Sequence, residues 1–268
     1  MKREIYGLAL ALVFAASFAA AQGGGEKDGG DKRRTGYQDM SPALQQMADD
    51  DTSNPGMLFV QAGQELWKQP AGKSNKACAD CHGAVDTSMK GVAARYPAIP
   101  PSISGGGADK PVDLEGRINL CRTGQQQAEA LKPESEDLLA LDAYVTYASR
   151  GLPIAPPADP RLAKVRELGK TLFTRREGQL NLSCANCHDD NAGKKLAGAT
   201  IPQGHPTAYP VYRSEWQTLG SLKRRLRNCV IGMRAEAYAY DSAEYLALEV
   251  YLMDRAKGLK IESPGIRP

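Results

Sequence analysis

Two five-residue segments of the chain share the pattern Cys-x-x-Cys-His and lie 106 positions apart (78 to 184). The first is Cys78-Ala-Asp-Cys81-His82, and the second is Cys184-Ala-Asn-Cys187-His188. Two thiols at this spacing can bond to the two vinyl groups of one haem, and the histidine that follows can bind its iron. The pattern therefore predicts two covalently bound haem c groups, attached at Cys78, Cys81, Cys184 and Cys187, with His82 and His188 as iron ligands.

Two other kinds of site use Cys-x-x-Cys pairs. A zinc site needs four ligands, and a thioredoxin-type redox site lacks the trailing histidine. Because both segments end in histidine and occur at matched positions, we favour haem attachment over these alternatives.

The similarity between the two segments continues along the chain, which indicates an internal duplication. Gly63-Gln-Glu-Leu66-Trp67 matches Gly169-Lys-Thr-Leu172-Phe173 at the same offset of 106. Tyr96-Pro97 corresponds loosely to Tyr209-Pro210. We therefore expect the two halves to form the same structural unit.

Both halves show the same order of expected elements. A short helix precedes the haem motif, and a Pro/Gly-rich loop, a helix with arginine and cysteine, and a final amphipathic helix follow it. The final helices end at Gly151 and at Gly258, since glycine commonly terminates helices. No run alternates with period two for long enough to predict strands. The expected fold is all-α, with two haem domains of the class I cytochrome c type related by duplication.

The N-terminus has the features of an export signal. Lys2 and Arg3 precede an apolar run, which ends in Ala19-Ala20-Ala21. This pattern predicts a signal peptide over residues 1–21 and a periplasmic protein. The apolar run is short for a membrane span, and no other segment has the composition of one.

Composition divides the rest of the chain. Residues 22–50 are expected to form a disordered, Gly-rich leader and an entry segment. The two haem domains are predicted over residues 51–152 and 163–268, and the Pro-rich residues 153–162 are predicted to link them.

Charge and aromatic content narrow the function. The chain has 34 basic and 31 acidic residues, and this near balance does not suggest nucleic-acid binding. It has only four Phe and two Trp, which is a small number for the hydrophobic cores of two domains. A large apolar cofactor in each domain would help to fill that shortfall.

Cys121 and Cys229 are the two cysteines outside the haem motifs. Cys121 follows His82 by 39 residues, and Cys229 follows His188 by 41. A thiolate from each could be the second axial ligand of its iron, which would stabilise Fe(III) and lower the potential. A disulfide between the two is one alternative, although it would need both haem pockets to open toward each other. Two inert buried cysteines are the other.

A basic segment surrounds Cys229 in the sequence. Arg225 lies one helical turn before it, within Lys223-Arg224-Arg225-Leu226-Arg227, and Arg213 and Arg234 are nearby. Cations beside a sulfur-ligated haem would suit a small dianion. For Arg225 we favour this function. For Arg224 and Arg227 we favour a solvated helix face or contacts with haem propionates.

Two further residues have less defined predictions. Arg117 is the repeat counterpart of Arg225, and we expect it to have a structural role or to contact a propionate. His205, in Gly204-His205-Pro206, could be a distal ligand, a proton donor or a loop residue, and we favour the loop role.

The second half also resembles one family. Arg225-x-x-x-Cys229, Met233-Arg234-Ala235-Glu236 and Tyr245-Leu-Ala-Leu-Glu249-Val-Tyr251 are similar to the SoxA subunits of SoxAX cytochrome complexes. The resemblance covers nearly the whole mature chain. Because the first Cys-x-x-Cys-His is present, the chain is most similar to the two-haem form.

The resemblance implies a function, partners and site residues. It implies a complex with a SoxX-type monohaem cytochrome c that oxidatively conjugates thiosulfate to a cysteine of a SoxYZ-type sulfur carrier. It also implies that Cys229 ligates the active-site haem and is found as a persulfide, that Arg225 lies in the active site, and that Cys121 ligates the first haem. Two competing functions are a dihaem electron carrier without catalysis and a dihaem peroxidase, which needs one open iron.

Overall fold

The computed structural model describes residues 31–101 and 110–268. The predicted signal peptide, residues 1–21, and most of the predicted leader lie outside the described residues. Arg33–Pro268 forms one unit. Across the described residues, no helix combines the length and the apolar character needed to cross a membrane.

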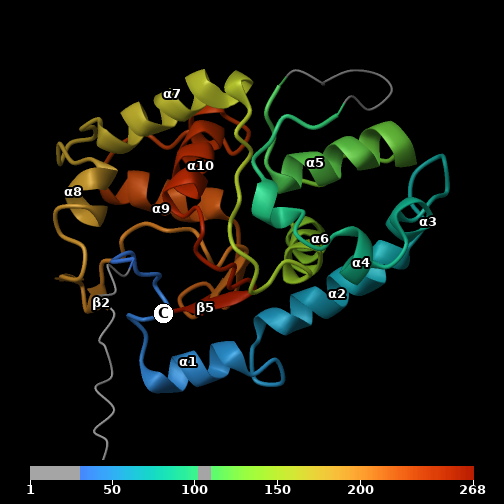
Figure 1. The fold of residues 1–268 in the computed structure, drawn as a ribbon, viewed down its shortest axis with the longest axis horizontal. Coiled ribbons are helices and arrows are strands. Elements are labelled where there is room, and N and C mark those ends of the chain that lie inside the picture. Colours follow the sequence, from blue (N-terminus) through green and yellow to red (C-terminus); the bar gives the residue numbers. More distant parts are fainter. Residues whose placement is uncertain (1–30, 102–109) are drawn as a thin grey trace, which may run out of the picture. The chain divides into compact units, whose positions relative to one another are not determined.

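The elements of the first half are mainly helical (Figure 1). In chain order they are α1 (Pro42–Asp49), α2 (Gly56–Lys68), α3 (Cys78–His82), α4 (Val85–Ser88), the 3₁₀ turn η1 (Ala93–Arg95), α5 (Leu114–Cys121), the π-turn η2 (Arg122–Gln126) and α6 (Glu136–Tyr147). Helix α1 lies in the predicted entry segment.

The second half repeats the helices and adds short strands. Its elements are η3 (Pro160–Leu162), α7 (Ala163–Thr174), α8 (Cys184–His188), β1 (Lys195–Leu196), β2 (Ala199–Thr200), β3 (Val211–Arg213), β4 (Thr218–Gly220), α9 (Leu222–Gly232), α10 (Ala243–Arg255) and β5 (Gly265–Arg267). Helices α7, α9 and α10 pack together beside the group formed by α2, α5 and α6 (Figure 1).

The matched glycines of the repeat lie where two helices cross in each half. A Cβ added at Gly63 on α2 would lie 2.0 Å from the carbonyl oxygen of Ala140 on α6. A Cβ at Gly169 on α7 would lie 1.9 Å from that of Ala247 on α10. Only a residue without a side chain allows the backbones to approach this closely. The repeated glycines therefore set the same crossing in both halves.

Side-chain caps fix the start of each haem-motif helix. Before α8, the Ser183 N–H donates to Asn186 Oδ1 at 3.1 Å, and the Asn186 N–H donates to Ser183 Oγ at 3.2 Å. Before α3, the Ala77 N–H donates to Asp80 Oδ2 at 2.8 Å. The second residue between the paired cysteines differs between the motifs, but Asp80 and Asn186 both accept a hydrogen bond from the backbone N–H of the residue that precedes the helix.

The strands correct the prediction of an all-α fold. β3 pairs antiparallel with β4 and parallel with β5, and β1 pairs with β2 in a hairpin. Each strand has two or three residues, too few to show an alternating pattern in the sequence. The β3–β5 pairing also joins segments far apart in the chain, which no local signal predicts.

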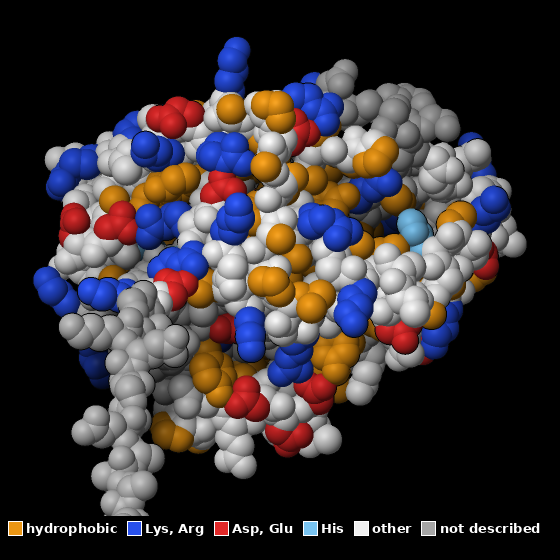
Figure 2. Space-filling view, viewed as in Figure 1, with side chains coloured by type: hydrophobic (Ala, Val, Ile, Leu, Met, Phe, Trp, Pro, Cys, Tyr) orange, Lys and Arg blue, Asp and Glu red, His pale blue; other side chains and the backbone are white. Residues whose placement is uncertain are grey.

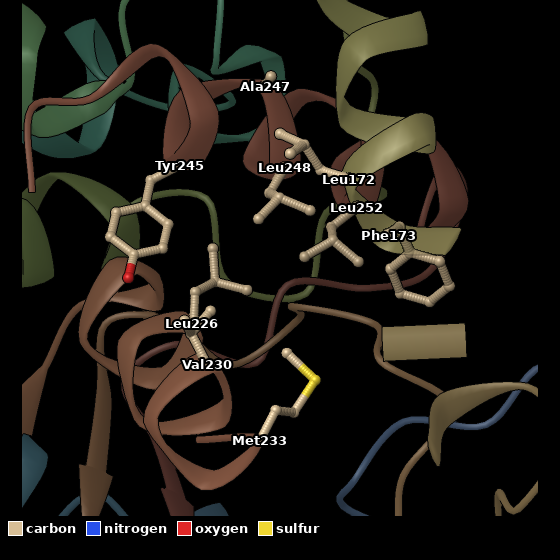
Figure 3. Packing of buried hydrophobic residues seen from close by; sticks show 9 residues of the cluster. All are labelled: Leu172, Phe173, Leu226, Val230, Met233, Tyr245, Ala247, Leu248 and Leu252. Carbon is tan, nitrogen blue, oxygen red and sulfur yellow. The ribbon is translucent and has the colours of Figure 1, made fainter. Parts of the chain in front are cut away.

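The largest buried apolar cluster lies in the second half, where Tyr245, Phe173 and Ala247 are at most 1% exposed (Figure 3). Its side chains come from α7, α9 and α10. A second cluster joins Ala93 and Ala94 of the first half to Ile154, Ala256 and Ile261.

The Pro-rich segment 153–162 takes part in this second cluster. Ile154 is 1% exposed, and its N–H donates to the carbonyl of Leu259 at 2.8 Å. The Ala155 N–H donates to the carbonyl of Ala94 at 2.9 Å. The segment therefore hydrogen-bonds to residues of both halves.

Basic side chains are spread over the viewed face of the molecule and do not form one continuous field (Figure 2). This distribution agrees with the near balance of charge in the sequence.

Candidate active site

A cavity of about 160 Å³ brings together the residues predicted around the second haem motif. Cys184 and His188 line it from α8, and Arg225 and Cys229 line it from α9. Apolar side chains complete its walls: Phe173, Leu222, Leu226, Leu248 and Leu252. We call it the second haem cavity.

The His188 ring is held in one orientation. Its Nδ1 lies 2.7 Å from the carbonyl oxygen of Pro202. A carbonyl only accepts hydrogen bonds, so Nδ1 carries a proton. Nδ1–H donation to a backbone carbonyl is the usual support of an iron- or zinc-binding histidine. Gly204, at a φ of +71°, packs its backbone against the same ring.

Cys229 faces His188 across the cavity, and each side chain shifts the pKa of the other. Burial opposes ionisation of the Cys229 thiol, but the interaction with His188 and the charge of Arg225 outweigh burial and lower its pKa. Burial also opposes a charge on His188, yet the interaction with Cys229 raises the pKa of the ring. The site thus stabilises a thiolate sulfur opposite the histidine.

Two arginines line the same cavity close to Cys229. Arg225 lies one turn before Cys229 on α9, and its side chain is 33% exposed. Arg213 comes from β3 and is 13% exposed. The charge of Arg225 contributes, after burial, to a lowered pKa of Arg213. Like charges this close form an electropositive site that favours an anion.

Glu215 is the carboxylate next to these arginines. Its Oε1 accepts a hydrogen bond from Arg213 Nε at 2.8 Å and lies 4.0 Å from Arg225 Nη1. Glu215 follows β3 in the turn toward β4, and its side chain is 48% exposed. A partly exposed carboxylate therefore neutralises part of the charge of the two arginines.

The other basic residues around Cys229 in the sequence have structural contacts. The Arg224 guanidinium carbon lies 4.3 Å from the centre of the Trp216 ring, and Arg227 Nη1 donates to the Tyr238 carbonyl oxygen at 2.7 Å. Lys223 forms ion pairs with Asp113 and Glu115. None of the three lines the second haem cavity. Of the four basic residues in the segment 223–227, only Arg225 does.

Two cavity arginines could not be identified from the local sequence pattern. Arg213 was noted only for its nearness to Arg225 in the sequence, and no signal marked Arg267. The parallel pairing of β3 with β5 places Arg213 opposite Arg267, and both line the cavity. Arg267 is paired with Glu262 at 2.5 Å. Strand β5 thus contributes charge to the site.

His205 lies in the loop that follows β2. Its side chain borders the second haem cavity, and its Nδ1 lies 2.7 Å from the carbonyl oxygen of Arg34. This contact attaches the loop to the segment before α1.

The first haem motif lines a larger cavity of about 550 Å³, which we call the first haem cavity. Cys78, Cys81 and His82 lie on its α3 side, and Cys121 lies at the end of α5. The apolar lining of the cavity includes Trp67, Leu141 and Val145.

Arg117 contributes an unpaired donor to the first haem cavity. Its Nη1 is buried and has no hydrogen-bond partner among residues 31–101 and 110–268. A buried guanidinium nitrogen without a partner fits an anionic group such as a haem propionate. The two thiols, the facing His82 and Cys121, the apolar walls and this donor together match what haem c requires.

The structure also bears on the alternative chemistries of the cysteines. All six are free, and Cys121 and Cys229 line different cavities, so the structure contains no disulfide between them. In the part of the chain that the structure describes, no group of three or more His, Cys, Asp or Glu is placed to hold a metal ion by itself.

Comparisons with known proteins identify the family. The family model for the SoxA/TsdA cytochrome c domain matches residues 62–154 and again residues 168–261. The chain is 38% identical over 219 residues to the L-cysteine S-thiosulfotransferase subunit SoxA of Pseudaminobacter salicylatoxidans, covering 81% of this chain and 75% of that protein. It is 35% identical to the subunit of the same name from Rhodovulum sulfidophilum, covering 88% and 81%.

A solved structure agrees with this assignment. The crystal structure of SoxXA from P. pantotrophus matches with a TM-score of 0.82 and 30% identity, covering 88% of this chain and 87% of that chain. Two cytochrome c segments, relatives at these identities and the matching fold lead to one conclusion: the chain belongs to the SoxA family of cytochromes, whose cytochrome c domains carry haem c.

Proposed function

We propose that the chain is the catalytic subunit of a periplasmic SoxAX-type complex that oxidatively conjugates thiosulfate to a cysteine of a SoxYZ-type sulfur carrier. One observation carries this proposal. Cys229, whose lowered pKa favours the thiolate form, faces His188 in a cavity that Arg213 and Arg225 also line. A sulfur centre beside two cations suits a reaction of a small sulfur dianion.

Two haem c groups are part of the proposal, one in each half. Cys78 and Cys81 would attach the first and Cys184 and Cys187 the second. The axial pairs would be His82 with Cys121 and His188 with Cys229. When bound, haem supplies one-electron redox chemistry. The domains would be residues 51–152 and 163–268, both of the class I cytochrome c type and related by duplication.

The net reaction defines what the residues must do. A carrier thiol and thiosulfate form one sulfur–sulfur bond, giving the cysteine S-thiosulfonate and releasing two electrons and one proton. Two cations can hold the doubly negative substrate with charge-assisted hydrogen bonds. Arg225 and Arg213 are therefore assigned to binding and orienting thiosulfate, so that its outer sulfur faces the Cys229 sulfur or the carrier thiol.

The remaining residues keep this arrangement in place. The Pro202 carbonyl orients His188, and the caps before α8 fix the helix that carries it. The electrons pass to a SoxX-type monohaem cytochrome c. The apolar walls of the cavity limit access of water to the sulfur.

Replacing Cys229 tests the proposal. We expect Cys229→Ala to abolish thiosulfate-dependent modification of the carrier, followed by mass spectrometry of the carrier cysteine. Both haems should stay attached, because the four thioether cysteines are unchanged. Gln179→Ala is a matched surface control. Full activity of Cys229→Ala would contradict the proposed site.

Low-temperature EPR of the oxidised protein tests the axial ligands independently of turnover. We expect two low-spin signals typical of thiolate-ligated haem. Cys121→Ala should remove one and Cys229→Ala the other. Signals typical of His/Met ligation, with no turnover of thiosulfate and carrier, would instead support a dihaem electron carrier.

A further inference from the structure

A third cavity, of about 90 Å³, has a lining that overlaps those of both haem cavities. It shares Tyr96 with the first haem cavity and Tyr209 with the second. These tyrosines are equivalent in the repeat, and each precedes a cis proline. The third cavity is therefore adjacent to both haem cavities.

Carboxyl groups from several elements surround this third cavity. Glu115 on α5, Asp142 on α6 and Glu249 on α10 line it and are 6%, 9% and 7% exposed. Asp113, the N-cap of α5, also lines it, and its side chain is 13% exposed. Glu134 completes the group, since it accepts a hydrogen bond from Ser221, a residue of the lining. We call these five residues the junction carboxyl cluster.

The cations next to the cluster cannot neutralise it. Lys223 on α9 is 9% exposed and forms ion pairs with Asp113 and Glu115. Arg224 lies 3.9 Å from Glu134. Five carboxylates beside two cations would leave an excess of negative charge in a buried site, which is strongly unfavourable. The cluster is therefore expected to retain protons near neutral pH.

One unsatisfied oxygen within the cluster supports this conclusion. The hydrogen bond that Asp142 accepts from Thr146 at 2.9 Å favours the ionised form of Asp142, but burial outweighs it and raises the pKa. Glu115 Oε1 is buried and has no hydrogen-bond partner among the described residues. A protonated carboxyl can donate to a water molecule or to a neighbouring oxygen, which removes this deficit. Burial raises the pKa of Glu115, Asp142 and Glu249 in the same direction.

We propose that the junction carboxyl cluster is a proton-binding site shared by the two haem sites. When an electron enters either haem, a proton from solvent binds to a carboxylate of the cluster. The proton returns to solvent when the electron leaves the haem. One positive charge thus accompanies one negative charge, and no bond other than the O–H bond forms. The proposal depends on haem in both cavities but not on thiosulfate being the substrate.

The physical basis is charge coupling across a low-dielectric interior. Added negative charge near a carboxylate raises its affinity for a proton. Linkage requires that protonation favours the reduced haem by the same factor. Coupling between two sites is typically about 5–150-fold. A cavity of about 90 Å³ also has room for several water molecules at roughly 10–15 Å³ each, which can relay the proton.

The conjugation reaction supplies both species. Joining a thiol to thiosulfate releases two electrons and one proton. A cluster that holds a proton while electrons reside on the protein would limit the build-up of charge between the two haem sites. The site would thereby link electron flow through this subunit to pH.

The test is an equilibrium redox titration of the two-haem protein, followed by haem absorbance over a series of pH values across neutrality. For the unaltered protein, we expect the midpoint potential of at least one haem to fall as pH rises. Glu115→Gln combined with Asp142→Asn should abolish most of that fall. Asp137→Asn, an exposed change on the same helix as Asp142, should preserve it.

A second measurement does not require any variant. On reduction in weakly buffered solution, a pH indicator should report proton uptake. The reduced-minus-oxidised infrared spectrum should contain the C=O stretch of a newly protonated carboxyl. Potentials independent of pH in the unaltered protein, or a pH dependence that is the same in the double variant, would overturn the proposal. A thiosulfate-inactive protein with the predicted pH dependence would contradict the proposed function alone.

Discussion

The two halves of the molecule share a scaffold and differ in the cavities that it encloses. Gly63 and Gly169 set the same helix crossing, and Cys121 and Cys229 occupy equivalent helices. The first haem cavity, however, is about 550 Å³ and the second about 160 Å³. In the second, the histidine ring is held by a backbone carbonyl at 2.7 Å.

The basic residues near Cys121 and Cys229 also differ in number and in the elements that supply them. In the first half, Arg117 has a buried nitrogen without a described partner. In the second, Arg225 is accompanied by Arg213 and Arg267, which the strand pairing of β3 and β5 brings to the cavity. The duplication thus supplied two equivalent cavities, and the added strands bring extra positive charge to one of them. This difference is the reason why we propose the second half as the site of thiosulfate chemistry.

Exchanging the equivalent arginines for alanine tests that assignment most strongly. We expect Arg225→Ala to lower kcat/KM for thiosulfate by about 10²–10³-fold, the usual cost of losing one positioned donor to a reacting anion. Arg117→Ala should lower it by less than tenfold, because that residue lies in the other cavity. Arg227→Ala, on the same helix as Arg225 but outside the cavity, is the control. Equal losses at Arg117 and Arg225 would refute the functional division.

The shared scaffold predicts equal effects of glycine substitutions. Gly63→Ala and Gly169→Ala each place a Cβ within about 2 Å of a backbone oxygen, so each should cost about 1–3 kcal/mol of unfolding free energy. Gly232→Ala, whose Cβ would meet nothing within 4 Å, should be nearly neutral. Urea unfolding followed by circular dichroism measures all three. A large cost in only one half would show that the two crossings are not equivalent.

The junction carboxyl cluster predicts how stability depends on pH. Burial raises the pKa of Glu115 above its ordinary value of 4.5, so the folded state binds more protons than the unfolded state. The stability from this group is present below pH 4.5 and is lost as pH rises through the folded-state pKa. The slope should approach about 1.4 kcal/mol per pH unit for each such group. Denaturant midpoints at several pH values should show a flatter profile for Glu115→Gln than for Asp137→Asn.

Glu215 should produce the smallest effect. It neutralises part of the charge of Arg213 and Arg225, and its side chain is about half exposed. We therefore expect Glu215→Gln to lower the KM for thiosulfate by only about 1.4–5-fold, equivalent to about 0.2–1 kcal/mol. Glu167→Gln, at an exposed position on α7, is the control. An increase in KM would mean that Glu215 supports the arginines and does not compete with the substrate.

Sequence reasoning could place residues that are marked by local patterns. The haem motifs, the repeated glycines and the spacing of Arg225 from Cys229 on one helix could all be read directly. It placed Lys223 wrongly, with the cations near Cys229. The structure shows that this residue faces buried carboxylates instead. A helix has several faces, and only the packing of neighbouring elements decides which face each basic residue occupies.

The sequence by itself determined the positions of the two Cys-x-x-Cys-His motifs, the duplication and the placing of Arg225 one turn before Cys229, because motifs, repeats and helical spacing can be read from the order of residues. Tertiary structure alone decided the strand pairing that adds Arg213 and Arg267, the different sizes of the two haem cavities, and the meeting of five carboxyl groups beside Lys223. These features join segments far apart in the chain. Their contacts follow from how the helices and strands pack together, which no short window of sequence specifies.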